Sequence, residues 1–153
     1  MKTALITGAS GEIGAAIARH FAGAGYGVAA HGAKHFEAAQ ALAASLRESG
    51  RTAVAVQGDL SDPETCARVF SESEAALGPI DVLVNGAGMS LVDFFDAVSP
   101  ADWSALVGTN LSSAVWLSQC AARSMIRRKA GAIVNISSIW GVSGAAMEVA
   151  YSA

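Results

Sequence analysis

The chain contains little charge. Only 15% of its 153 residues are Asp, Glu, Lys or Arg, while 52% are hydrophobic, which is the opposite of the composition of a disordered chain. The formal net charge of −3 gives no electrostatic reason to expect nucleic acid as a partner. The length suits one domain with its own hydrophobic core, so we expect a single domain over residues 1–153.

Long apolar runs and metal-ligand patterns are absent as well. No apolar run approaches the roughly 18 residues of a membrane-spanning helix, and the apolar stretch before Gly8 is too short for a signal peptide. Cys66 and Cys120 are far apart and fit no metal-binding spacing, and no histidine forms a ligand pattern with acids or cysteines. We therefore expect no membrane partner, no metal, and free thiols in a reducing, cytoplasmic compartment.

What the sequence does contain is an alternation of short apolar segments and segments with helical spacing. Strands are predicted at residues 4–7, 28–30, 52–56, 82–84 and 133–136. Helices are predicted at residues 13–24, 36–49 and 61–77, and one long helix is predicted from 99 to 129. This alternation is typical of a parallel sheet covered on both faces. The predicted fold class is therefore α/β, a Rossmann-type doubly wound parallel sheet.

Local patterns predict further details of these helices. The stretch Ser61-Asp62-Pro63-Glu64 has the form of a capping box with proline in the first turn, and Ser99-Pro100-Ala101-Asp102 gives a similar signature. In the helix over 36–49, the residues placed on one face are Ala38, Ala41, Leu42, Ser45 and Leu46.

Candidate functional residues follow the predicted strands. In an open parallel sheet, ligands bind beyond the carboxyl ends of the strands. The stretch 8–14 follows the first strand, Asp59 the third, 85–88 the fourth, and Ser137 and Ser138 the fifth. Because all of these loops meet at one edge of the sheet, they indicate a binding site more strongly than any one of them alone.

The stretch TGASGEIG, residues 7–14, has the form of a phosphate-binding glycine loop. Gly8 can make the tight turn, Gly11 can leave room for a ligand, and Gly14 can let the following helix pack closely. Backbone N–H groups at the start of that helix would then face a pyrophosphate. Taken by itself, the loop could equally be an ordinary turn between a strand and a helix.

Several motifs together resemble the short-chain dehydrogenase/reductase family over all 153 residues. They are the glycine loop, NGAG at 85–88, Asn110 in TNLSS, and the pair Ser138 and Tyr151. Within the family, the chain looks most like the 3-oxoacyl-[acyl-carrier-protein] reductases. The stretch ISSIWGVSGAAMEVAYSA also resembles reductases that act on an aminopentanone modification of elongation factor P. The chain departs from the family pattern at Glu12 and Gly86, where the family has glycine and asparagine.

The resemblance implies a bound dinucleotide. The residues that it places at the cofactor, apart from Lys34 discussed next, are Gly8, Ser10, Gly11, Ile13, Gly14, Asp59, Leu60, Asn85, Gly86 and Ala87. Glu12 adds bulk and negative charge inside the loop, so we expect somewhat weaker phosphate binding than in the family.

The choice between the two nicotinamide dinucleotides depends on the residues after the second strand. An acidic residue there would hold the ribose 2′-hydroxyl of NAD, but no Asp or Glu lies between Ile13 and Phe36. His31, Lys34 and His35 lie in that region instead, and a cation suits the 2′-phosphate of NADP. We therefore expect NADP(H) rather than NAD(H), with Lys34 at the phosphate. The alternative for Lys34 is a solvated loop lysine.

The resemblance also implies the reduction of a small-molecule or carrier-bound ketone to an alcohol. Tyr151 would donate the proton, Ser138 would hydrogen-bond the carbonyl oxygen, and Asn110 would steady a water in a proton relay. An unperturbed tyrosine has a pKa near 10, so a nearby cation is needed. The family supplies a lysine four residues later, at position 155, whereas this sequence ends at Ala153.

We expect the 153 residues to be part of a longer homo-oligomeric reductase whose C-terminal strands are missing here, and to have little or no turnover alone. Without those strands, the strand at 133–136 would form a bare apolar edge. Two alternatives remain: a short module that binds a dinucleotide without catalysis, and an inactive truncated product.

Overall fold

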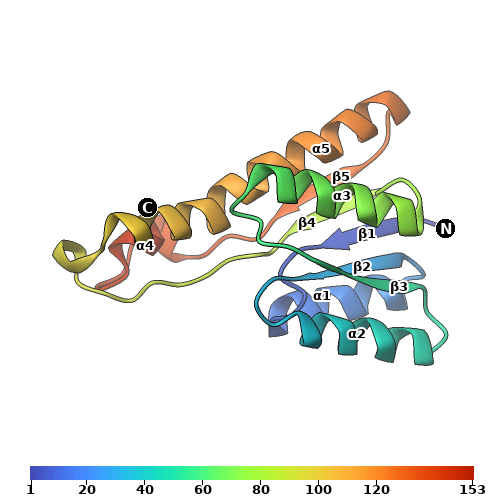
Figure 1. Ribbon diagram of the computed structural model, residues 1–153, viewed down its shortest axis with the longest axis horizontal. Helices are drawn as coiled ribbons and strands as arrows, with labels where there is room; N and C mark the ends of the chain where they lie inside the picture. The colour runs from blue at the N-terminus through green and yellow to red at the C-terminus, as the bar shows by residue number, and fades with distance from the viewer.

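Five parallel strands form one sheet in the order β3-β2-β1-β4-β5. This arrangement comes from a computed structural model, which describes residues 1–153. The strands are β1 (Thr3–Ile6), β2 (Gly27–Gly32), β3 (Ala53–Gln57), β4 (Val82–Asn85) and β5 (Ala132–Asn135) (Figure 1). The chain runs outward from β1 to β3 and then returns to the other side of β1, so the direction of winding reverses between β1 and β4. This reversal is the place where open α/β sheets bind ligands.

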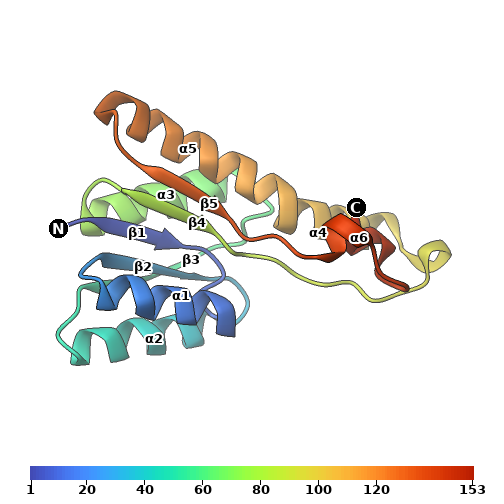
Figure 2. The same cartoon turned by 180° about the vertical axis from the view of Figure 1, so that it is seen from behind.

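Helices cover both faces of the sheet. α1 (Glu12–Gly23) and α2 (Phe36–Glu48) lie on one face, and α3 (Pro63–Leu77) and α5 (Ser113–Arg128) lie on the other (Figures 1 and 2). Shorter elements extend beyond the carboxyl ends of the strands: η1 (Phe95–Ala97), α4 (Pro100–Val107), α6 (Trp140–Ser143) and α7 (Val149–Ser152). The predicted doubly wound α/β fold is confirmed.

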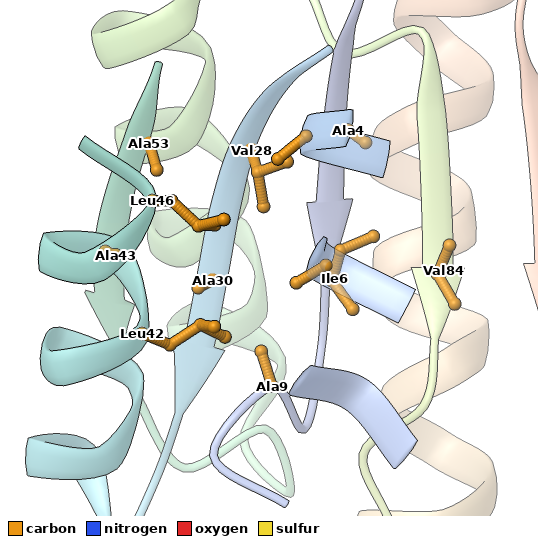
Figure 3. Close-up of a cluster of buried hydrophobic side chains, with 12 residues drawn as sticks. Ala4, Ile6, Ala9, Val28, Ala30, Leu42, Ala43, Leu46, Ala53 and Val84 are labelled. Atoms are coloured by element: carbon orange, nitrogen blue, oxygen red, sulfur yellow. The ribbon is translucent and has the colours of Figure 1, made fainter. Parts of the chain in front are cut away.

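The alternation of side chains along the strands builds a separate core on each face. Ile6 and Val28 point toward α1 and α2, where Leu42 and Leu46 of α2 meet them (Figure 3). Leu5, which directly precedes Ile6 in β1, points to the opposite face of the sheet and packs with residues of α3 and α5. Because both faces are buried, the central strands consist of nearly continuous apolar residues, as the sequence has them.

The predicted long helix is interrupted. A π-helical segment, η2 (Gly108–Ser112), joins α4 to α5, so the helix that begins at Pro100 changes its hydrogen-bond pattern around Asn110. The spacing of apolar residues could not predict this, since a π segment adds only a local extra residue to the turn. Ser99 caps α4 as expected, because its Oγ accepts a hydrogen bond from the N–H of Asp102 (3.1 Å).

Two predicted details of the other helices are wrong. The residue that caps α3 is Asp62, whose carboxylate accepts from the N–H of Thr65 (2.7 Å), and Ser61 bonds Asp59 instead. In α2 the buried positions are Ala39, Leu42, Ala43 and Leu46, rather than a face that includes Ala38, Ala41 and Ser45. Alanine is small and apolar on every side of this helix, so the pattern alone did not decide which alanines face the sheet.

β5 lies at one edge of the sheet, pairs only with β4, and has its side chains exposed. No helix combines the length and the apolar composition needed to cross a membrane. No group of His, Cys, Asp and Glu side chains is arranged to hold a metal ion.

Candidate functional site

The glycine loop between β1 and α1 contains two positions at which only glycine fits. Gly8 has φ +70°, and a Cβ there would lie 2.6 Å from the carbonyl oxygen of Gly86. A Cβ on Gly14 would lie 2.7 Å from the carbonyl carbon of Gly8, so α1 packs directly on the loop. Gly11 differs, because a Cβ there would make only an ordinary contact of 3.5 Å with the Gly8 oxygen. Protein packing therefore requires glycine at positions 8 and 14, whereas at position 11 it would also accept a residue with a Cβ atom.

The start of α1 presents backbone N–H groups that no protein acceptor uses. Neither the backbone nor the side-chain hydrogen bonds involve the N–H groups of Glu12, Ile13 or Gly14, and Gly11 at the N-cap has no side chain to accept them. The side chain of Ile13 is 69% exposed, so this end of the helix faces solvent. Free amides and the positive end of the helix dipole together attract an anion such as a phosphate.

Thr7 fixes the glycine loop to the loop after β4. Its hydroxyl donates to the carbonyl oxygen of Val84 (3.2 Å) and accepts from the N–H groups of Gly86 (2.9 Å) and Ala87 (3.0 Å). The same threonine oxygen thereby satisfies two amides of the β4 loop. The two loops on either side of the switch point between β1 and β4 are held together as one unit.

Lys34 follows the end of β2, and Asp59 follows the end of the neighbouring β3. The Asp59 carboxylate accepts hydrogen bonds from the N–H (3.0 Å) and the Oγ (2.8 Å) of Ser61, and these bonds lower its pKa. The positive charge of Lys34 lowers the pKa of Asp59 further. Leu60 is buried in the core under α3, so only its backbone can face a ligand at this edge.

The side chain of Asn85 faces into the protein. Asn85 is 6% exposed, and its Nδ2 donates to Asn135 Oδ1 (2.8 Å) and to Ser118 Oγ (3.1 Å). Its Oδ1 is buried without a partner. The side chain therefore ties β4 to β5 and α5, and any contact of this residue with a dinucleotide falls to its backbone.

Asn110 occupies the π-helical segment and holds the loop after β4. Its Oδ1 accepts from the N–H of Met89 (2.8 Å), and its Nδ2 donates to the carbonyl oxygen of the same residue (2.8 Å). Both polar groups of the side chain are thus committed to the backbone. A function in a proton relay, as predicted from the sequence, stays a prediction, and the structure adds a positioning function to it.

Ser138 and Tyr151 lie at the same end of the molecule as Asn110. Ser138 follows β5, is partly buried, and its Oγ accepts from the N–H of Trp140 (3.2 Å). Tyr151 is half-buried on α7, which contacts both α4 and α6 (Figure 2). A hydrogen bond from the N–H of Ala145 to Ser152 Oγ (3.2 Å) holds the segment after α6 on α7. The candidate catalytic residues therefore come from the π segment, the loop after β5 and α7, which all lie beyond the carboxyl ends of the strands.

A groove of about 600 Å³ lies between α5 and β5. The residues that line it include Asn110, Val115, Gln119, Ile133 and Ser137. A second groove of about 460 Å³ lies between α1 and α2 and contains Ser10, Gly11, Glu12 and Arg19. Glu12 thus borders the loop on its solvent side, and its carboxylate stands at the start of α1.

One residue was assigned the wrong state from the sequence. The sequence predicts His31, like Lys34, as a possible cation at the 2′-phosphate, which is wrong because His31 is 2% exposed and burial lowers its pKa. Its Nδ1 accepts a hydrogen bond from the N–H of Gly8, which a protonated ring could not do. The signal was present in the strand alternation, since His31 and the buried Ala29 are two positions apart in β2 and share a face. His35, by contrast, is exposed, and its Nδ1 lies 3.6 Å from Oε1 of Glu37.

Comparison with known proteins decides the family. The model of the short chain dehydrogenase family matches residues 2–153. The chain belongs to the short-chain dehydrogenase family. This confirms the resemblance that the motifs indicated.

Relatives in the family include proteins named as acetoacetyl-CoA reductase and as 3-oxoacyl-[acyl-carrier-protein] reductase. The chain is 41% identical over 152 residues to nodulation protein G of Azospirillum brasilense, covering 99% of the chain and 62% of the relative. It is 40% identical over 153 residues to acetoacetyl-CoA reductase of Shinella zoogloeoides, covering 99% of the chain and 61% of the relative. A 3-oxoacyl-[acyl-carrier-protein] reductase of Staphylococcus aureus is 34% identical over 143 residues, covering 94% of the chain and 58% of the relative. The chain therefore spans about three fifths of the length of these family members.

Solved structures of family members have the same fold. A metagenomic short-chain oxidoreductase in complex with NADP matches with a TM-score of 0.92 at 36% identity, covering 99% of this chain and 67% of that one. A gluconate 5-dehydrogenase from Burkholderia cenocepacia, in complex with NADP and tartrate, matches with a TM-score of 0.90 at 34% identity, covering 99% and 59%.

Proposed function

We propose that the protein reduces a ketone, such as a 3-oxoacyl thioester, to an alcohol with NADPH as the hydride donor. The observation that carries the proposal is the start of α1, where the N–H groups of Glu12, Ile13 and Gly14 have no protein acceptor beside a turn that only glycine can make. This is the geometry that holds a pyrophosphate. The acetoacetyl-CoA reductase and 3-oxoacyl-[acyl-carrier-protein] reductase relatives support the reaction class.

The preference for NADPH over NADH rests on the charges at the ends of β2 and β3. Lys34 is exposed, and its positive charge lowers the pKa of Asp59. The loop that follows β2 contains no acidic residue that could hold a free ribose 2′-hydroxyl. A lysine ammonium can pair with the 2′-phosphate of NADPH. The two related structures that hold NADP support this preference.

The protein's own residues would supply the proton and the hydrogen bonds for the reaction, while the nicotinamide supplies the hydride. Tyr151 donates a proton to the carbonyl oxygen as negative charge develops there, and Ser138 donates a hydrogen bond to the same oxygen. Asn110 keeps the loop after β4 in place through Met89. We further propose that the protein works as a homo-oligomer, as the family resemblance implies.

The test is the Tyr151→Phe variant, expressed from the natural gene and assayed with NADPH and acetoacetyl-CoA. Removing only the phenolic hydroxyl should lower kcat by about 10²–10⁴-fold, the range of general acid catalysis, while the Kd for NADPH stays within about twofold. Tyr26→Phe is the matched control, since Tyr26 packs against Phe21 far from the site and should keep wild-type kcat. Equal kcat for wild type and Tyr151→Phe would overturn the assignment of the acid.

A further inference from the structure

His31 links two of the loops that meet at the carboxyl edge of the sheet. It lies near the end of β2 with 2% of its surface exposed. Its Nδ1 accepts a hydrogen bond from the N–H of Gly8 (3.3 Å), and its Nε2 lies 2.9 Å from the carbonyl oxygen of Gly58. Gly8 makes the turn of the glycine loop, and Gly58 directly precedes Asp59. The imidazole therefore spans from the phosphate-binding turn to the loop after β3.

The two partners define the protonation state of the imidazole. A backbone N–H can only donate, so Nδ1 of His31 must carry a lone pair. A carbonyl oxygen can only accept, so Nε2 must carry the proton. Only the neutral ring protonated at Nε2 satisfies both contacts. A second proton on Nδ1 would point at the N–H of Gly8, and two donors would then face each other in a buried place.

The backbone of His31 holds the same loop at a second point. Its carbonyl oxygen accepts from the N–H of Ala9 (2.8 Å), next to Gly8. The glycine loop is thus fixed by Thr7 on the β4 side and by His31 on the β2 side. Loss of the hydrogen bond to the imidazole would constrain the Gly8 amide less. The orientation of the glycine loop toward α1 would then be less constrained as well.

On the basis of the proposed function, we propose that neutral His31 is a positioning residue for the dinucleotide: it holds the Gly8 turn against the Asp59 loop, and its protonation breaks this link and weakens dinucleotide binding. No part of the proposed chemistry uses His31, and it cannot reach a ligand from its buried position. Its effect is therefore on affinity, through the loop.

The direction of the pH effect follows from the surroundings of His31. The charged group that acts on His31 is Asp59, on the loop after β3. Around that loop, Lys34 and Asp62 act on Asp59, Asp59 and Asp62 act on Cys66 of α3, and Arg68 of α3 donates to the carbonyl oxygen of Gln57. Burial lowers the pKa of His31 below its ordinary 6.5, and the Gly58 hydrogen bond and the charge of Asp59 offset this only in part. The neutral ring therefore prevails at pH 7, and the link is lost as the pH falls through the lowered pKa of His31.

The experiment is a titration with NADP⁺ between pH 7.5 and 5, since the oxidised dinucleotide withstands acid. The variant is His31→Asn, whose Oδ1 can accept from the Gly8 N–H in place of Nδ1 but cannot be protonated in this range. The phosphate of the ligand itself titrates near pH 6, so the quantity to compare is the ratio of the two proteins' Kd values at each pH. The wild-type Kd should rise relative to that of His31→Asn by up to about tenfold per pH unit below the pKa of His31.

Controls separate this proposal from the proposed function. Absence of NADP⁺ binding by the wild type at pH 7.5 would contradict the proposed function itself. Binding at pH 7.5 with a Kd ratio that stays constant down to pH 5 would overturn the positioning assignment of His31. His20→Asn removes an exposed histidine on α1 and should follow the wild type at every pH. If His31→Asn does not fold, nitrogen NMR of the wild type decides: a protonated Nδ1 at pH 7 would contradict the proposal.

Discussion

Asn110 and Met89 exchange two hydrogen bonds, so that a side chain in the π-helical segment closes a ring with the backbone of the loop after β4. This pair joins the helix that runs from α4 to α5 with a loop that leaves the centre of the sheet. Asn110 lies within the π segment Gly108–Ser112, so the part of the helix with altered hydrogen bonding is also the part that holds this loop.

Replacing Asn110 with alanine should lower the free energy of unfolding by about 1–2 kcal/mol, because two hydrogen bonds of ordinary strength are lost at a partly exposed place. Urea unfolding followed by circular dichroism measures this. Gln119→Ala, at an exposed position of α5 without hydrogen bonds, is the control and should change stability by less than about 0.5 kcal/mol. Equal stability of the two variants would mean that the Met89 pair contributes nothing.

Alanine substitutions at Gly14 and at Gly11 should have different effects on the stability of the protein. Gly14→Ala places a methyl group against the Gly8 carbonyl and should destabilise the protein by about 1–3 kcal/mol. Gly11→Ala meets no close contact and should cost less than about 1 kcal/mol. If Gly11 leaves room for a pyrophosphate, Gly11→Ala should nevertheless weaken NADPH binding. Thermal unfolding and NADPH titration of both variants separate packing from ligand binding, and normal stability of Gly14→Ala would show that the packing argument fails.

Changing Lys34 to aspartate should move the dinucleotide preference toward NADH. The substitution removes a partner of the 2′-phosphate and supplies an acceptor for a free 2′-hydroxyl, so the ratio of the Kd values for NADPH and NADH should rise by about tenfold or more. Lys2→Asp makes the same charge change at the start of the chain, before β1, and should leave the ratio as in the wild type. A ratio that does not move in Lys34→Asp would mean that Lys34 is a solvated loop lysine.

The thiol of Cys66 should be unreactive in the folded protein. It is buried on α3, its Sγ donates to the carbonyl oxygen of Leu60 (3.2 Å), and burial raises its pKa from 9.0 to about 11. A raised pKa in the folded state stabilises the protein below pH 9, and this contribution is lost as the pH rises toward 11. Iodoacetamide at pH 8 should therefore label Cys66 only after denaturant is added, as mass spectrometry can show. Rapid labelling of the native protein at Cys66 would contradict the buried position.

The sequence was sufficient to predict the fold, and it assigned a candidate site to the carboxyl edge of the sheet, which stays a prediction. Apolar strands such as residues 82–84 alternate with helices, and the loops after them carry glycine, asparagine or serine, which follows from the chemistry of a parallel sheet. The π segment around Asn110 could not be predicted, because one extra residue in a single turn is a local change that the spacing of apolar residues does not reveal.

The state of His31 was missed for a related reason. A strand predicted over residues 28–30 leaves His31 in the loop with Lys34, whereas β2 continues to Gly32, and the alternation along it places His31 on the same buried face as Ala29. The capping residue of α3 was displaced by one position because Asp59, outside the helix, binds Ser61. For His31 and for the cap of α3, contacts with other segments of the chain decided which of two local structures formed.

The most direct test of the account is a calorimetric titration of the purified 153-residue protein with NADPH and with NADH at pH 7.5. The account predicts one dinucleotide bound per chain, with a lower Kd for NADPH than for NADH, because free amides at the start of α1 and the cation of Lys34 meet at one edge of the sheet. A folded protein, shown by circular dichroism and a cooperative unfolding transition, that binds neither dinucleotide would contradict it.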